Sequence, residues 1–177
     1  MQQFAARHPE VAPALAEAVG QVQAIAQVYG LQVGSAGLLR LAAVAGAIAQ
    51  SVQRTFGRVI TVDAEAAADF ELPEAESIPI ALTINELLTN AVKHGDAGAV
   101  HVGIADEGGG ALIEIVHPGR LPEGFDLARF PGGVSGLGLV RALLPRRSAT
   151  LSLLQDGEAV RTRVALTPPS VRRPQPA

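Results

Sequence analysis

The side chains best suited to chemistry lie in one short stretch, residues 85–95, which reads NELLTNAVKHG. Glu86 and Asn90 are four residues apart, so on a helix they share one face, and Lys93 and His94 follow on that face or at its edge. The amide oxygen of Asn90 can ligate a hard cation, Lys93 can meet a phosphate as a point charge, and Glu86 can accept a proton. This set of side chains suits a Mg²⁺-phosphate site. The same spacing is also found in a solvated polar stripe on an amphipathic helix, so both interpretations stay open.

A second stretch, about forty residues later, is rich in glycine and opens another predicted helix. Glycines at the start of a helix let backbone N–H groups approach phosphates, and the helix dipole favours the anion. The stretch lacks the lysine of a P-loop, and no parallel-sheet context supports a dinucleotide fingerprint. Taken alone it also fits a flexible loop before a helix. Its candidate binding residues are Gly133, Ser135, Gly136, Leu137, Gly138 and Leu139.

The elements that must position these residues follow from apolar periodicity and turn residues. Residues 78–94 and 136–144 are predicted helices, and a glycine run at 106–110 joins two predicted strands, 99–105 and 111–116. The loop 118–133 is rich in proline and glycine. The other predicted elements are helices at about 9–29 and 38–52, strands at 58–63 and 66–72, and a hairpin formed by 149–154 and 159–166.

This order predicts an α+β fold, a two-layer α/β sandwich with helices on one face of a mixed sheet. Three parts are expected along the chain. Residues 1–35 form a helical segment, residues 36–167 form the layered domain, and residues 168–177, rich in proline, form a disordered tail.

Bulk composition excludes several classes of protein. The net charge is −3 and the pI is about 5.8, which argues against a general nucleic-acid surface. No apolar run is long enough for a membrane span, and the first ten residues do not resemble a signal peptide, so a cytoplasmic protein is expected. The absence of cysteine excludes disulfides and thiolate metal sites. Lys93 is the single lysine among fourteen basic residues.

Together the two stretches resemble the N-box and the G2 box of the GHKL superfamily, which includes gyrase, MutL and sensor histidine kinases. The Lys93-His94 ending is similar to that of the kinases, and the flanking sequences are similar to their HisKA_2 branch. The resemblance covers roughly residues 37–167 and implies a Bergerat ATP-binding fold.

The resemblance also implies roles for individual residues. Asn90 would hold Mg²⁺, Glu86 would be the polar catalytic residue, and Lys93 and His94 would lie near the phosphates of ATP. The backbone around Gly136 and Gly138 would wrap those phosphates beneath a mobile lid, residues ~120–135.

One motif of the family is altered. The G1 box carries an Asp that binds the adenine amino group, and His117 stands at that position. Gly119 matches the first glycine of the box, and the second glycine is missing. A neutral His accepts one hydrogen bond through its unprotonated nitrogen, whereas a protonated His accepts none. Adenine binding through His117 and a degenerate pocket are therefore both open.

The phosphoacceptor histidine is not recognisable either. The predicted helix at 9–29 resembles the second of two dimerisation helices, and His8 precedes it in a sequence that is not an H-box. The expected protein is therefore a protein histidine kinase that transfers the γ-phosphoryl of ATP to a histidine outside this segment. A response regulator and a second copy of the chain are its expected partners. The alternatives are a degenerate module for protein interaction or phosphotransfer and a serine kinase of the anti-sigma type.

Overall fold

The computed structural model describes residues 12–34, 38–66, 68–129, 133–134 and 136–174, and Ser135 and His8 lie outside these ranges. Helices and strands alternate in pairs along the chain, as the sequence predicts. In chain order the elements are α2 (Ala12–Val33), β1 (Leu39–Arg40), α3 (Leu41–Phe56), β2 (Ile60–Ala64), β3 (Glu71–Leu72), α4 (Glu74–His94), β4 (Val100–Glu107), β5 (Gly110–Pro118), η1 (Leu127–Arg129), α5 (Gly136–Leu143), β6 (Ala149–Asp156) and β7 (Ala159–Leu166).

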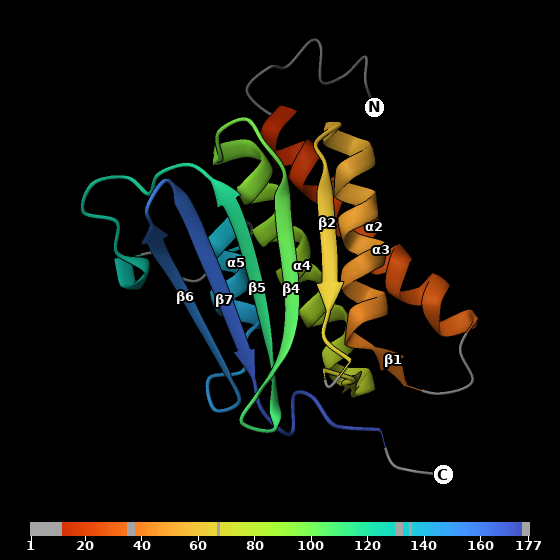
Figure 1. The fold of residues 1–177 in the computed structure, drawn as a ribbon. Coiled ribbons are helices and arrows are strands. Elements are labelled where there is room, and N and C mark those ends of the chain that lie inside the picture. The colour runs from red at the N-terminus through yellow and green to blue at the C-terminus, as the bar shows by residue number, and fades with distance from the viewer. Residues whose placement is uncertain (1–11, 35–37, 67, 130–132, 135, 175–177) are drawn as a thin grey trace.

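The main sheet has five strands in the order β2-β4-β5-β7-β6, and the helices pack on one of its faces (Figure 1). Strands β2 and β4 are parallel, and the other neighbours are antiparallel, so the sheet is mixed. The hairpin β4–β5 turns at Gly108 and Gly109, whose φ angles of 63° and 84° favour glycine. The predicted α+β class and two-layer arrangement are confirmed.

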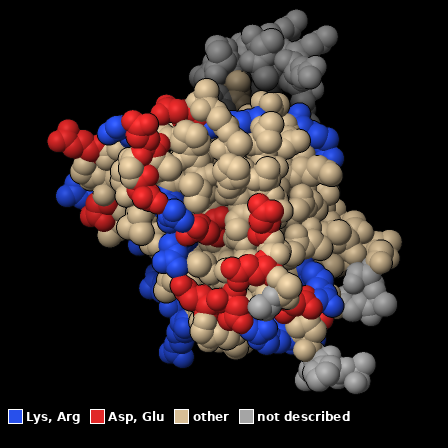
Figure 2. All heavy atoms as spheres, viewed as in Figure 1, with Lys and Arg blue, Asp and Glu red and all other residues tan. Residues whose placement is uncertain are grey.

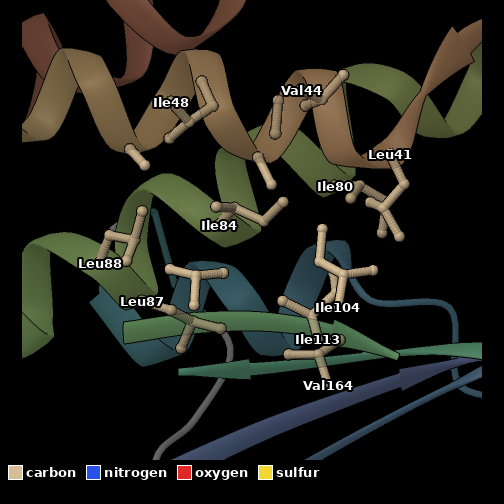
Figure 3. Close-up of a cluster of buried hydrophobic side chains, with 14 of the residues drawn as sticks. Leu41, Val44, Ile48, Ile80, Ile84, Leu87, Leu88, Ile104, Ile113 and Val164 are labelled. Carbon is tan, nitrogen blue, oxygen red and sulfur yellow. The ribbon is translucent and has the colours of Figure 1, made fainter. Parts of the chain in front are cut away.

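The core lies between this sheet and helices α3 and α4 (Figure 3). Alternate residues of the strands face inward, as for Ile104 of β4 and Ile113 of β5, each 1% exposed. Ile84 and Leu88, four residues apart on α4, meet them from the helical layer and are 1% and 0% exposed. Burying each such side chain contributes about 1.5–3 kcal/mol, so α4 is anchored along most of its length.

Helix α2 packs on α3 and α4 and shares their core. Ala24 and Val28, four residues apart on one face, are 1% and 0% exposed. The opposite face carries Val22, Tyr29 and Val33, which are 66%, 57% and 90% exposed. The segment predicted as an N-terminal part therefore packs against the other helices, and its outer face carries exposed apolar side chains.

Several predicted boundaries are wrong, among them the ends of α2, at Val33 and not at residue 29, and of α3, at Phe56 and not at residue 52. The strand expected at 66–72 is reduced to β3, which pairs with β1 outside the main sheet. Because β1 takes up Leu39 and Arg40, α3 begins at Leu41 and not at residue 38. Helix α4 begins at Glu74, four residues early, since its acidic first turn lacks the apolar period that marks the rest.

The tail from residue 168 was predicted to be disordered, and residues 168–174 are ordered against the fold. Val171 is 0% exposed and belongs to the core cluster. Arg172 and Glu71 exchange backbone hydrogen bonds of 2.8 and 3.0 Å, which adds the tail to the edge of β3. Composition missed this because the two segments are about a hundred residues apart in the chain.

The outer face of the sheet is charged, with acidic and basic side chains interspersed (Figure 2). Arg161 of β7 pairs with Glu114 of β5 at 2.5 Å, and Arg163 pairs with Glu107 at 2.7 Å. These pairs are partly exposed, and surface pairs of this kind contribute about 0–1 kcal/mol each. No helix among the described residues is long and apolar enough to cross a membrane.

Candidate functional site

A cavity of about 470 Å³ lies between the end of α4, α5 and the inner face of the sheet. Its volume falls within the range typical of small-molecule sites. Side chains from five elements and the loop after β5 form its wall: Leu87, Asn90, Ala91, His94, His117, Arg120, Leu121, Pro122, Phe125, Leu137, Leu153, Val160 and Thr162.

The end of α4, which carries Asn90 and His94 into the cavity wall, is held by Arg58. The Nη1 of this arginine donates to the carbonyl oxygens of Val92 and Gly95 at 3.0 and 3.1 Å. Its Nε donates to Gly98 at 2.7 Å, and its Nη2 donates to the carbonyl of the intervening Asp96. Carbonyls at a helix C-terminus have no partner within the helix, so one guanidinium both satisfies them and opposes the negative end of the dipole.

The end of β5 is joined to the end of α4 through Pro118. Its carbonyl oxygen accepts the N–H of Asp96 at 2.8 Å and the Nδ1 of His117 at 2.9 Å. Gly95 lies against this junction, where a Cβ would stand 2.5 Å from the carbonyl oxygen of Ala91 and 2.9 Å from that of Pro118. Only glycine fits there, so the residue that ends the helix also makes room for the His117 ring.

His117 is 7% exposed and lines the cavity. Burial lowers the pKa of its imidazole, and the hydrogen bond to Pro118 opposes that shift, so the ring is neutral near pH 7. A carbonyl oxygen only accepts, so Nδ1 carries the proton and Nε2 is an acceptor. None of the described residues hydrogen-bonds to Nε2. The cavity wall therefore presents an unused acceptor at this point.

Glu86 connects three segments beside the cavity. Its Oε2 accepts the backbone N–H of Gly136, the first residue of α5, at 2.9 Å. Its Oε1 accepts the Nε2 of Gln21 on α2 at 3.3 Å, and the same nitrogen donates to the carbonyl of Val134 at 3.1 Å. Glu86 is only 3% exposed, and this burial raises its pKa. The hydrogen bonds from Gly136 and Gln21 act in the opposite direction and lower the pKa.

The start of α5 has the form of an anion site. Gly136 has φ 58°, which favours glycine, and its N–H points out of the first turn to a carboxylate oxygen of Glu86. A negative group at this end of a helix is stabilised by the dipole and the free N–H groups. In this structure the carboxylate of Glu86 occupies that position.

The predicted site residues divide between two places. Asn90, His94, His117 and Leu137 line the cavity together. Glu86 and Lys93 line a second cavity, on the side of α4 that faces α2. Gly119, with φ 142°, borders the His117 junction, Gly133 is exposed, and Gly136 is bound to Glu86. Gly138 and Leu139 are half-buried in α5 outside the cavity wall, and Ser135 lies outside the described residues.

Sequence reasoning missed three residues of the site. Arg58 follows a helix in what reads as a strand, and Gln21 is one of several glutamines on α2. Each acts on residues tens of positions away in the chain. Thr162 of β7 lines the cavity and is 6% exposed, and only the register of β5 with β7 brings its hydroxyl to that wall. None of the three has a local signal in the sequence.

The described residues contain no group of three or more His, Cys, Asp or Glu side chains that could hold a metal ion by themselves. Asn90 is a half-buried carboxamide on the cavity wall, which can contribute one oxygen ligand. A cation there would take its remaining ligands from a bound molecule and from water.

No protein-family model matches the sequence, and the search of curated proteins gave no match. Solved structures are similar. The histidine kinase domain of the blue-light activated histidine kinase EL346 of Erythrobacter litoralis is 23% identical, with a TM-score of 0.68 over 84% of this chain and 73% of that chain. ShkA, solved at full length in complex with AMPPNP, is 17% identical, with a TM-score of 0.60 over 99% of this chain and 40% of that chain.

The EL346 kinase at greater length has a TM-score of 0.65 at 23% identity, over 82% of this chain. The matched region is 46% of that kinase, so this chain spans less than half of its length. These likenesses show that the chain has the fold of histidine kinase catalytic domains.

Proposed function

We propose that the chain is the ATP-binding catalytic domain of a two-component sensor histidine kinase, and that it transfers the γ-phosphoryl of ATP to a histidine outside this segment. The observation that carries the proposal is the cavity between α4, α5 and the sheet, which brings Asn90, His94 and His117 to one wall. Residues from the N-box and the altered G1 box meet there, beside the start of α5.

The wall at His117 fits adenine. The free Nε2 acceptor matches the exocyclic amino group of adenine, which donates, and does not match guanine, which presents a carbonyl oxygen at the same place. Thr162 adds a hydroxyl that donates or accepts. His117 can thus replace the carboxylate of the family, and it does so only while its ring is neutral.

The other end of the cavity fits phosphate. The N-terminus of α5 would hold the phosphates once its Gly136 N–H exchanges Glu86 for a phosphate oxygen. Asn90 would contribute an oxygen ligand to Mg²⁺, and His94 on the same wall would supply a hydrogen bond nearby. Bound ATP supplies the phosphoryl group. The chain contributes position and charge, which dominate phosphoryl transfer.

Glu86 is the residue that we assign to proton acceptance. Its burial raises its pKa, and a carboxylate with a raised pKa is a stronger base. Its oxygens are bound to Gly136 and Gln21 in this structure, so it becomes available when either hydrogen bond is exchanged.

The remaining parts of the proposal concern partners and place. The apolar outer face of α2, with Val22, Tyr29 and Val33 at helical spacing, would pair with the same helix of a second copy. A response regulator would take the phosphoryl group from the acceptor histidine. A domain that uses ATP and such a partner would act in the cytoplasm, as the sequence predicts.

A second candidate is a degenerate module that binds no nucleotide and acts in protein interaction or phosphotransfer. The observation in its favour is that the chain satisfies the start of α5 by itself, through Glu86, and carries His117 in place of a carboxylate. The two candidates differ in whether the cavity takes a nucleotide.

Calorimetric titration of the chain with ADP and Mg²⁺ tests the proposal. We expect saturable binding that disappears in Asn90→Ala and survives in Gln50→Ala, which removes an exposed carboxamide from α3 far from the cavity. ADP at a hundredfold excess over its Kd should stabilise the fold by about 2.7 kcal/mol, which a thermal shift would show. The absence of both heat and thermal shift at millimolar ADP would refute the kinase function and leave the degenerate module.

A further inference from the structure

A second cavity of about 300 Å³ lies on the opposite side of α4, between α2, α3 and α4. It shares no lining residue with the nucleotide cavity. Its volume is at the lower end of the range for small-molecule sites. The nucleotide function makes no use of it, except that Glu86 and Lys93 form part of its wall.

Two polar side chains that line this cavity form no hydrogen bond to a described residue. Asn85 is 6% exposed, and none of the described residues hydrogen-bonds to its side chain. Its Nδ2 lies under α2 at Gly20, where a Cβ would stand 3.5 Å away. Ser51 of α3 is 9% exposed, and its hydroxyl also has no bond to a described residue. Because both side chains line the cavity and have no partner among the described residues, their polar atoms are available to a ligand or to water.

The rest of the wall is mainly apolar. Leu15 and Val19 of α2 face Val52 and Phe56 of α3 across the cavity, and Val52 is 4% exposed. A carboxamide floor under apolar walls matches a flat ring that carries its own carboxamide. One amide then donates to and accepts from the other, while the ring contacts the aliphatic side chains.

We propose that this cavity binds a small neutral aromatic carboxamide, with its amide on Asn85 and its ring among the apolar side chains of α2 and α3. Two carboxylates, Glu17 and Glu86, and one ammonium, Lys93, line the same cavity, so its charge disfavours an anionic ligand. The two cavities share no lining residue, although Glu86 takes part in both proposals, and the proposal does not depend on ATP binding.

The cavity is placed to influence α5. Glu86 lines it and at the same time holds the first N–H of α5, and Gln21 of α2 holds Glu86 from above. A ligand on Asn85 lies one residue from this junction along α4. Its binding would therefore affect the packing of α2 on α4.

Benzamide is the probe, followed by NMR titration of the chain without nucleotide. We expect shifts of the Asn85 side-chain amide and saturable binding, with toluene, which lacks the amide, at least tenfold weaker. Asn85→Leu keeps the size of the side chain and removes the amide, so benzamide should bind about tenfold more weakly or not at all. Ser77→Ala, which removes a buried hydroxyl bonded to Pro73 elsewhere on α4, should bind benzamide as the wild type does.

A second variant keeps the test valid if Asn85→Leu does not fold. Ala16→Phe fills the cavity from the exposed helix α2 and should abolish binding while Asn85 stays in place. Equal affinity of benzamide for the wild type and either cavity variant would overturn the proposal. So would a crystal structure, grown with benzamide, in which only water occupies the floor.

Discussion

Gly95 offers a sharp test of how the end of α4 is built. Replacing it by alanine adds one carbon to a backbone whose φ of −80° suits any residue, so conformational strain is not involved. The new Cβ would stand 2.5 Å from the carbonyl oxygen of Ala91 and 2.9 Å from that of Pro118, and closer still to Nδ1 of His117. Two of these three neighbours are backbone atoms that cannot rotate away.

The cost follows from two effects. Overpacking at a site that cannot relax typically destabilises by about 1–3 kcal/mol. Moving the His117 ring also breaks its 2.9 Å hydrogen bond to Pro118, worth about 0.5–1.5 kcal/mol. We therefore expect Gly95→Ala to lower the free energy of unfolding by about 2–4 kcal/mol.

Gly46 provides the matched control with the opposite sign. It lies in the interior of α3, and a Cβ there would meet nothing within 4 Å. Alanine is the better helix former by about 0.5–1 kcal/mol, so Gly46→Ala should stabilise the chain.

Urea unfolding, followed by circular dichroism, measures the free energy of unfolding of both variants. In thermal unfolding, Tm should move by roughly 2–4 °C per kcal/mol for a chain of this size. If Gly95→Ala and the wild type have the same free energy of unfolding, the tight junction of α4, β5 and His117 does not exist as described. Nucleotide affinity should fall along with stability in Gly95→Ala if His117 reads adenine, and it should not change in Gly46→Ala.

Two further predictions concern the same junction. Burial lowers the pKa of His117 below its usual 6.5, so below pH 6.5 the unfolded chain takes up a proton that the folded chain does not. As the pH falls, the free energy of unfolding therefore decreases by up to about 1.4 kcal/mol per pH unit. His117→Gln should lack this pH dependence in urea titrations between pH 5 and 8. Identical pH profiles of the two chains would contradict it. Arg58→Ala should lose about 1–3 kcal/mol in thermal unfolding, because the carbonyls at the end of α4 lose their donor. Arg58→Lys keeps the charge without the planar fork and should be intermediate, and full rescue by lysine would show that charge alone matters.

Elements with a strong local pattern were predictable from the sequence. The N-box helix has apolar residues at helical spacing along its length, and the two long hairpins turn at glycines that need positive φ. These patterns determined the α+β class and the helix-on-sheet layers. The glycine-opened α5 followed for the same reason, because glycine at a helix start is a local signal.

Features that depend on distant partners were not predictable. The predicted strand at 66–72 is reduced to the two residues that pair with β1, and the tail is ordered because Val171 packs in the core. Arg58 and Gln21 act on carbonyls and a carboxylate that folding brings to them. No window of sequence contains both halves of these interactions.

The faces of α4 show where pattern reasoning loses resolution. Residues four apart differ by about 40° around a helix, which is close enough to predict a shared face for Glu86 and Asn90. Because α4 borders one cavity toward α2 and another toward the sheet and α5, residues of this one face line different cavities. Lys93, seven residues after Glu86, differs from it by only about 20° and lines the same cavity toward α2, whereas Asn90 and His94 line the nucleotide cavity. Glu86 stands at the boundary and bonds in both directions, to Gln21 of α2 and to the start of α5. The polar stripe therefore separates the two cavities, and α2 is connected to the proposed phosphate site through Glu86 and through the hydrogen bond of Gln21 to Val134.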